Sequence, residues 1–186
     1  MKIAISGAHS TGKTTFLKAL TEILKLKGID YVMLGDLAVK CPLPILKNHT
    51  VESTLWIASK GMFDEIEAEH KNKLVIVDRP ILDCWAYFQV ACKDKYSTDH
   101  PKLKALEAMI QNWSKTYDLT YQTIIDETIP IENAKGRILD TQYRTDVGNE
   151  MKMACDKFGI TPIYLEYSKT QYHLEGLLAK ILEHVN

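Results

Sequence analysis

Short apolar runs alternate along the chain with longer segments in which apolar residues recur every three or four positions. The runs are typical of buried strands, and the spaced pattern is typical of helices with one apolar face. This alternation predicts an α/β fold with a parallel sheet and right-handed crossovers. The predicted strands are residues 2–6, 30–34, 74–77, 120–125 and 161–167, and the predicted helices are residues 14–27, 51–70, 81–92, 101–117, 147–158 and 171–185.

The helix over residues 101–117 carries a single apolar stripe. Core packing is the favoured interpretation of this stripe, and a contact face in a homodimer is the alternative. No Pro/Gly/Ser-rich linker or repeat divides the 186 residues, of which 46% are hydrophobic. One domain over residues 1–186 is therefore expected. The residues of the stripe are Leu103, Leu106, Ile110, Trp113 and Tyr117.

The segment between the first predicted strand and the first predicted helix has the pattern G-x-x-x-x-G-K-[ST]. Its glycines let the backbone curl so that successive N–H groups, together with the helix N-terminus, point at one anion. Lys13 is expected to face solvent in the empty loop and to reach the β- and γ-phosphates of a nucleotide, while the Thr14 hydroxyl ligates Mg²⁺. The predicted phosphate-binding residues are Gly7, Ala8, His9, Ser10, Thr11, Gly12, Lys13, Thr14 and Thr15.

Composition narrows the class of partner. The net charge of −1 is too balanced for a protein that mainly coats nucleic acid, although a local basic groove stays open. The four cysteines show no CxxC pair or metal-ligand spacing, and the first strand begins without a signal peptide. No apolar run approaches the ~20 residues needed to cross a bilayer. A reducing cytoplasmic setting without a membrane partner is therefore expected.

Arginine is scarce beside lysine, since the chain has 20 lysines and only three arginines, Arg79, Arg137 and Arg144. Lysine already meets the need for surface charge, so each arginine is a candidate for bidentate phosphate binding, with a surface ion pair as the alternative. Asp78 and Arg79 directly follow the apolar run over residues 74–77. They are therefore predicted at the same sheet edge as the phosphate loop.

The other two arginines lie in the connection over residues 127–146. This connection is too long for an ordinary loop, and long ordered loops are commonly lids. Arg137 and Arg144 are thus predicted in a lid segment over residues 127–146. Asp146 is predicted as the N-cap of the following helix.

With these features the chain resembles the P-loop nucleoside and nucleotide kinases, in particular the small kinase-like ATPases grouped with thymidylate kinase and nicotinamide riboside kinase. The resemblance covers nearly the whole chain. Thymidylate kinases have a small hydroxyl residue where Asp83 stands and a glutamine where Phe88 stands, so the resemblance does not identify the base. It rests on the phosphate loop, on Asp78-Arg79 followed by Leu82-Asp83 and Ala86-Tyr87, and on Arg144 with Asp146 in the lid.

The resemblance implies a P-loop NTPase fold in which helices flank a five-stranded parallel sheet. ATP would bind the first loop, and the acceptor would lie over the strand ends. Lys13 and Mg²⁺ on Thr14 would neutralise the donor, while Arg144 and Arg137 would close over the transferring group as a lid. Asp78 would hold the magnesium shell through water.

The resemblance also implies roles on the acceptor side. Asp36, just past the second strand, would accept a proton or bind a second water-ligated metal. Arg79 would bind the acceptor, through an α-phosphate or through water to a sugar hydroxyl. The aromatic residues Trp85, Tyr87 and Phe88 would stack on its base or, as the favoured alternative, pack in the core.

The implied activity is ATP-dependent transfer of the γ-phosphate to a small acceptor, either a nucleoside monophosphate, which is favoured, or a nucleoside. Two other classes stay open. One is a nucleotide-driven switch or ATPase, although the chain lacks the Asn-Lys-x-Asp motif of GTPases. The other is a kinase for a base or an end within DNA or RNA, which the near-neutral charge disfavours.

Overall fold

A five-stranded parallel sheet forms the centre of the structure, a computed structural model that describes residues 1–131 and 139–185. The strand order is β2-β3-β1-β4-β5. β1 is the middle strand of the five, with Ile3 opposite Ile76 of β3 on one edge and Leu119 of β4 on the other. The predicted α/β fold with a parallel sheet is therefore confirmed. The strands are β1 (Lys2–Ser6), β2 (Val32–Leu34), β3 (Val75–Asp78), β4 (Leu119–Thr123) and β5 (Ile163–Leu165).

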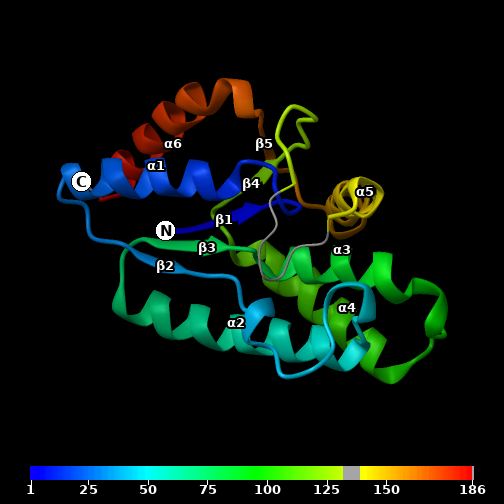
Figure 1. The fold of residues 1–186 in the computed structure, drawn as a ribbon. Coiled ribbons are helices and arrows are strands. Elements are labelled where there is room, and N and C mark those ends of the chain that lie inside the picture. The colour runs from blue at the N-terminus through cyan, green and yellow to red at the C-terminus, as the bar shows by residue number, and fades with distance from the viewer. Residues whose placement is uncertain (132–138, 186) are drawn as a thin grey trace.

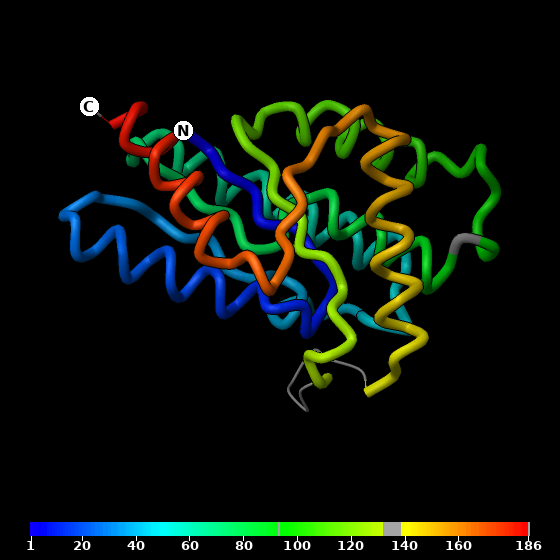
Figure 2. Tube along the Cα trace, turned by 90° about the horizontal axis from the view of Figure 1, so that it is seen from above, coloured from blue at the N-terminus to red at the C-terminus, as the bar shows by residue number. Residues whose placement is uncertain are grey.

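Helices cover both faces of this sheet (Figure 1). α1 and α6 lie side by side on one face, as Figure 2 shows from above, and α2, α3 and α4 lie on the other. α5 packs against α3. Ligand sites in such sheets lie beyond the carboxyl ends of the strands, so a ligand site is expected at the loops after β1, β2 and β3. The helices are α1 (Lys13–Leu26), α2 (Val51–Lys71), α3 (Ile81–Cys92), α4 (Pro101–Trp113), α5 (Thr141–Phe158) and α6 (Thr170–Val185).

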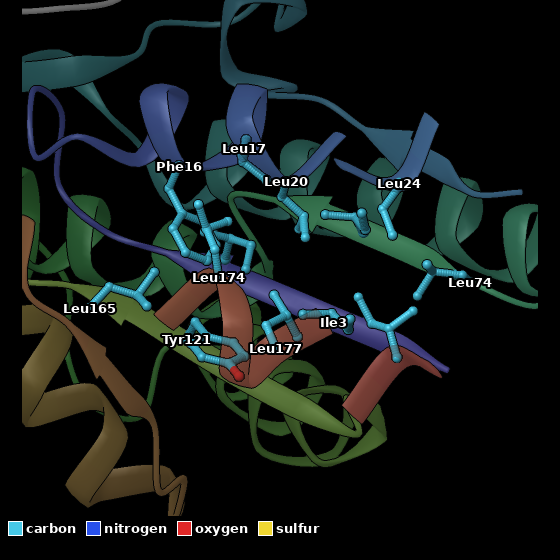
Figure 3. Packing of buried hydrophobic residues seen from close by; sticks show 13 residues of the cluster. Ile3, Phe16, Leu17, Leu20, Leu24, Leu74, Tyr121, Leu165, Leu174 and Leu177 are labelled. Carbon is cyan, nitrogen blue, oxygen red and sulfur yellow. The ribbon is translucent and has the colours of Figure 1, made fainter. Parts of the chain in front are cut away.

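The core under α1 and α6 follows the helical spacing of the sequence. Leu20 and Leu24 of α1 are fully buried and face Ile3 of the central strand, and Leu177 of α6 closes the same layer (Figure 3). The apolar faces of α1 and α6 meet over β1, and this packing holds α1 in place against the sheet. The phosphate loop is therefore held between a buried strand and a buried helix.

The apolar stripe of α4 packs into the second core, on the other face of the sheet. Leu106 and Ile110 are fully buried in one cluster with Phe88 of α3 and Phe158 of α5. Core packing is thus confirmed as the interpretation of this stripe. α4 is shorter than predicted because it ends at Trp113, where a 3-10 turn over Ser114–Thr116 follows.

A buried ion pair joins β1 to α2. The Lys2 ammonium lies 3.1 Å from a Glu65 carboxylate oxygen, and both side chains are almost fully buried. Glu65 also accepts hydrogen bonds from the Trp113 indole at 2.7 Å and the Tyr117 hydroxyl at 2.9 Å. Glu69 completes the cluster at 3.0 Å from Lys2. Every polar atom of the Glu65 carboxylate thus has a partner, which is the condition for burying a charge.

The start of α5 differs from the prediction. The helix begins at Thr141, not Val147, and its N-cap is Asp140, whose carboxylate accepts a hydrogen bond from the Tyr143 amide at 3.0 Å. The predicted N-cap Asp146 lies inside the helix and accepts from the Gln142 side chain at 2.8 Å. The prediction was wrong because the first turn is mostly polar, so the apolar period became visible only at Val147. The connection over residues 127–146 is correspondingly shorter.

Two further observations concern membrane-spanning helices and the cysteine side chains. No α-helix within residues 1–131 and 139–185 is long and apolar enough to cross a membrane. All four cysteines are free, and only Cys41 is partly exposed. The thiols therefore behave mainly as small buried groups.

Candidate active site

The loop after β1 has the backbone shape that an anion site requires. Gly7 and Gly12 have φ angles of 152° and 83°, which side chains rarely tolerate. A Cβ atom at Gly7 would lie 1.8 Å from the Thr123 hydroxyl oxygen, and one at Gly12 would lie 2.7 Å from the Tyr167 ring. No side chain of the described residues caps α1 at Gly12. The first amides of α1 are therefore left for a phosphate.

The remaining loop positions divide into buried and exposed groups. Thr11 is buried and its hydroxyl lies 2.9 Å from the Ala8 carbonyl and 2.6 Å from the Thr123 hydroxyl, which stabilises the curl. The ring of His9 is buried, with its centroid 6.1 Å from that of Tyr143. The Thr14 and Thr15 side chains are exposed beside the loop. Within the motif, Thr11 and His9 are therefore buried, whereas Thr14 and Thr15 are exposed.

Lys13 does not face solvent, contrary to the prediction. Its side chain is 7% exposed, and its ammonium pairs with the carboxylate of Asp78, the last residue of β3. Parallel pairing of β1 with β3 brings the two together, because Ile5 lies opposite Asp78. Burial lowers the pKa of Lys13, and the nearby Arg79 charge lowers it further, while Asp78 opposes both effects. A bound phosphate would therefore stabilise an ammonium that its surroundings disfavour.

Arg79 lies where β3 ends and connects the loop with the acceptor side. Its φ angle of 67° is unusual for a residue other than glycine, and such strain is found mostly at functional sites. The guanidinium forms an ion pair with Asp36, in which Nε lies 2.7 Å from a carboxylate oxygen. Its Nη1 donates to the Gly7 carbonyl at 3.2 Å and to the Tyr87 hydroxyl at 3.1 Å. Asp36, which follows β2, and Arg79 therefore form one unit with the phosphate loop.

A cavity of about 230 Å³ opens beside this unit, between the ends of β2 and β3 and the helices α2 and α3. Asp36, Arg79 and Tyr87 form its polar wall. Other charged side chains also line it, and the aliphatic part of the lining comes from Leu34, Val77, Ile57 and Ala58. A concave, mostly apolar site with a few charged groups is typical of small-ligand binding. The cavity is therefore the candidate acceptor site.

Of the three aromatic residues on α3, only Tyr87 lines the cavity. Trp85 and Phe88 are 4% and 1% exposed and pack in the core, where the Trp85 ring meets Phe158 edge-on at 5.4 Å. Core packing is thus confirmed for Trp85 and Phe88. A ring at Tyr87 remains available to the acceptor.

Sequence reasoning did not assign a role in this site to Asp83, although it is central here. Its carboxylate accepts hydrogen bonds from the Ser6 hydroxyl at 2.5 Å and the Gly7 amide at 3.3 Å, and it lies 3.7 Å from Nη1 of Arg79. Burial raises the pKa of Asp83 to about 6, against the opposing effect of Arg79. The available signal was a single carboxylate within the apolar run Ile81–Ala86.

Arg144 stands in the first turn of α5 and reaches the phosphate loop. Its side chain is almost fully buried, and Nη1 donates to the carbonyl oxygens of Ser10 at 3.3 Å and Ile129 at 3.0 Å. Its Nε is buried without a hydrogen-bond partner among the described residues. A buried donor of this kind next to an anion loop fits a phosphate oxygen as its missing partner. Arg137, the other predicted lid arginine, lies outside the described residues.

The predicted Mg²⁺ ligands provide few protein atoms. Thr14 is exposed in the first turn of α1, and Asp78, the last residue of β3, pairs with the neighbouring Lys13. Residues 1–131 and 139–185 contain no group of three or more His, Cys, Asp or Glu side chains that could hold a metal. This donor set fits Mg²⁺, which keeps most of its waters and binds nucleotide phosphates alongside one or two protein oxygens.

Comparison with known proteins gives one family match. Residues 2–172 match the sequence model of the AAA domain family. Comparison with curated proteins gave no match.

Solved structures show the same fold over almost the whole chain. A deoxyadenosine kinase from M. mycoides with bound dATP has a TM-score of 0.68 and 16% identity, covering 97% of this chain and 99% of that chain. A structure of that kinase with the products dCMP and a flexible dCDP has a TM-score of 0.67 and 16% identity, covering 98% and 100%. A thymidylate kinase from Candida albicans has a TM-score of 0.63 and 18% identity, covering 98% and 91%. The predicted fold of the P-loop nucleoside and nucleotide kinases is therefore confirmed.

Proposed function

Because the chain belongs to the AAA domain family, we propose that it is an ATP-dependent kinase whose acceptor is a nucleoside or a nucleoside monophosphate. One observation carries this proposal. Arg79 lines the acceptor cavity and donates to the Gly7 carbonyl of the phosphate loop at 3.2 Å, so a donor site and a second small-molecule site adjoin. A switch or motor ATPase has no need of the second site.

On the donor side, Lys13 and Arg144 supply the positive charge that phosphoryl transfer requires. The transition state spreads negative charge over the equatorial oxygens of the transferring group. Lys13 exchanges Asp78 for a phosphate oxygen, and the Nε of Arg144 donates to another. Thr14 and, through water, Asp78 would hold Mg²⁺, which would supply further positive charge to the phosphates.

On the acceptor side, Asp36 acts as the general base. It takes the proton of the acceptor oxygen as that oxygen bonds to the γ-phosphorus. The bond from the γ-phosphorus to the bridging oxygen breaks, and ADP leaves. Arg79 holds the Asp36 carboxylate in place through the 2.7 Å contact from Nε. Tyr87 fixes the guanidinium in turn, since its hydroxyl accepts from Nη1.

An acceptor screen with γ-labelled ATP tests the proposal. Nucleosides, their 5′-monophosphates, DNA and RNA are each incubated with the wild type, Lys13→Ala and Lys18→Ala. Lys18 is the matched control because it is an exposed lysine of the same helix. We expect labelled small-molecule product with the wild type and Lys18→Ala, and none with Lys13→Ala. ATP hydrolysis without an acceptor, or transfer only to DNA or RNA, would contradict the proposal.

A further inference from the structure

Charged side chains of both signs line the acceptor cavity. Among the described residues, four carboxylates line it, from Asp36, Asp64, Glu65 and Asp83, against two cationic side chains, Lys40 and Arg79. The buried His49 in the same wall adds no charge at neutral pH, since burial lowers its pKa to about 4. Lys2 pairs with Glu65 and Lys60 pairs with Asp64, so the negative charge that is not matched lies with Asp36 and Asp83, which share Arg79.

The charge of Arg79 is already matched within the site. Its Nε binds Asp36 at 2.7 Å, and its Nη1 lies 3.7 Å from Asp83. One guanidinium therefore faces two carboxylates. An anion brought to this arginine would meet a neighbourhood whose net charge is negative.

Asp83 is the carboxylate that creates this imbalance. It is 2% exposed, and the Ser6 hydroxyl and the Gly7 amide both donate to it, which stabilises its ionised form. At pH 7.5 it is mainly charged, since its pKa is about 6.

We infer that Asp83 makes the site selective for an uncharged acceptor, so that the kinase phosphorylates a nucleoside and rejects the matching 5′-monophosphate. The inference rests on the proposed kinase function and decides between its two acceptor classes. Arg79 then serves to orient Asp36 rather than to bind an α-phosphate. The transfer itself is unchanged, with the nucleoside hydroxyl losing its proton to Asp36 as its oxygen bonds to the γ-phosphorus and ADP leaves.

The test compares nucleosides with their 5′-monophosphates at pH 7.5, using kcat/KM for transfer and calorimetric binding of the monophosphate. The variants are Asp83→Asn, which removes the charge at constant size, and Asp83→Ser, which introduces a small hydroxyl. Asp156→Asn is the matched control, because it removes one charge from an exposed position of α5. Circular dichroism and thermal unfolding establish that each variant is folded.

For the wild type and Asp156→Asn we expect transfer to nucleosides and at least about a hundredfold lower kcat/KM for monophosphates. In Asp83→Asn or Asp83→Ser, monophosphate binding should tighten about tenfold or more relative to nucleoside binding. Efficient monophosphate transfer by the wild type, or an unchanged ratio in both folded variants, would overturn the role of Asp83 and leave the kinase function standing. Transfer to neither acceptor class would overturn both.

Discussion

The Arg144 guanidinium donates to the carbonyl oxygen of Ser10 at 3.3 Å, so a side chain of α5 rests on the phosphate loop. We expect Arg144→Lys to lower kcat by ~10³-fold or more, although the charge is kept. A planar guanidinium can serve the loop carbonyl and two phosphate oxygens at once, whereas an ammonium is a single point charge. Single-turnover transfer at saturating ATP measures the loss. Near-wild-type turnover would show that Arg144 only supports the loop.

The contact at Gly7 predicts a large cost for a single methyl group. Gly7→Ala should lower the free energy of unfolding by about 3 kcal/mol and abolish ATP binding, because the added Cβ would overlap the Thr123 hydroxyl at a φ of 152°. Gly28→Ala is the matched control. Gly28 also has a positive φ, 65°, but no atom lies within 4 Å of the position of an added Cβ. Gly28→Ala should therefore lower the free energy of unfolding by only about 1 kcal/mol. Urea unfolding measures both.

A second variant separates overlap from backbone strain at Gly7. Thr123→Ala removes the hydroxyl that the new methyl group would meet. Combined with Gly7→Ala, it should recover part of the lost free energy of unfolding, since the φ angle stays unfavourable. No recovery in the double variant would assign the whole effect to the backbone.

The buried His49 predicts a pH dependence of stability. Burial lowers its pKa to about 4 in the folded state, from an ordinary 6.5. The unfolded chain therefore binds more protons between pH 4 and pH 6.5, and stability falls as pH decreases through that window. Across this window, His49 lowers the free energy of unfolding by roughly 3 kcal/mol. Asp83 acts in the opposite direction because its pKa is raised, so the measurement is the difference between the wild type and His49→Gln. Parallel stability curves for the two proteins would contradict the prediction.

The ion pair between Lys2 and Glu65 predicts unequal costs for two neighbouring carboxylates. Glu65→Ala should lower the free energy of unfolding by about 3 kcal/mol or more, because it leaves the buried Lys2, the Trp113 indole and the Tyr117 hydroxyl without this acceptor. Glu69→Ala should cost less than about 1 kcal/mol, since its side chain is 42% exposed. Equal effects in chemical unfolding would show that the buried cluster is not the source of the difference.

The donor half of the site was predictable because its pattern is local. The phosphate-loop motif, the strand before it and the helix after it lie within residues 2–26. The apolar run that ends at Val77 likewise placed Asp78 and Arg79 at the correct edge of the sheet. In both cases, the side chains that define the position are close in sequence.

The interactions that the sequence did not reveal join distant segments. Asp83 lies 77 residues from Ser6 in the sequence, and Lys13 lies 65 residues from Asp78. The local pattern of apolar and polar residues therefore predicts neither contact. The burial of Lys13 was missed for this reason, because only the pairing of β1 with β3 brings its partner within reach. The true N-cap Asp140 was missed because a polar first turn hides the start of a helix.

The backbone of Gly7 forms hydrogen bonds with two residues that line the acceptor cavity. Its amide donates to Asp83 at 3.3 Å, and its carbonyl accepts from Arg79 at 3.2 Å. We expect a shift of either side chain on acceptor binding to alter the shape of the loop that would receive ATP. Thermodynamic linkage then requires reciprocity, so that whatever factor the acceptor applies to the affinity for ATP, ATP applies to the affinity for the acceptor. Through Gly7, we therefore expect the proposed acceptor site and the phosphate loop to influence each other's occupancy.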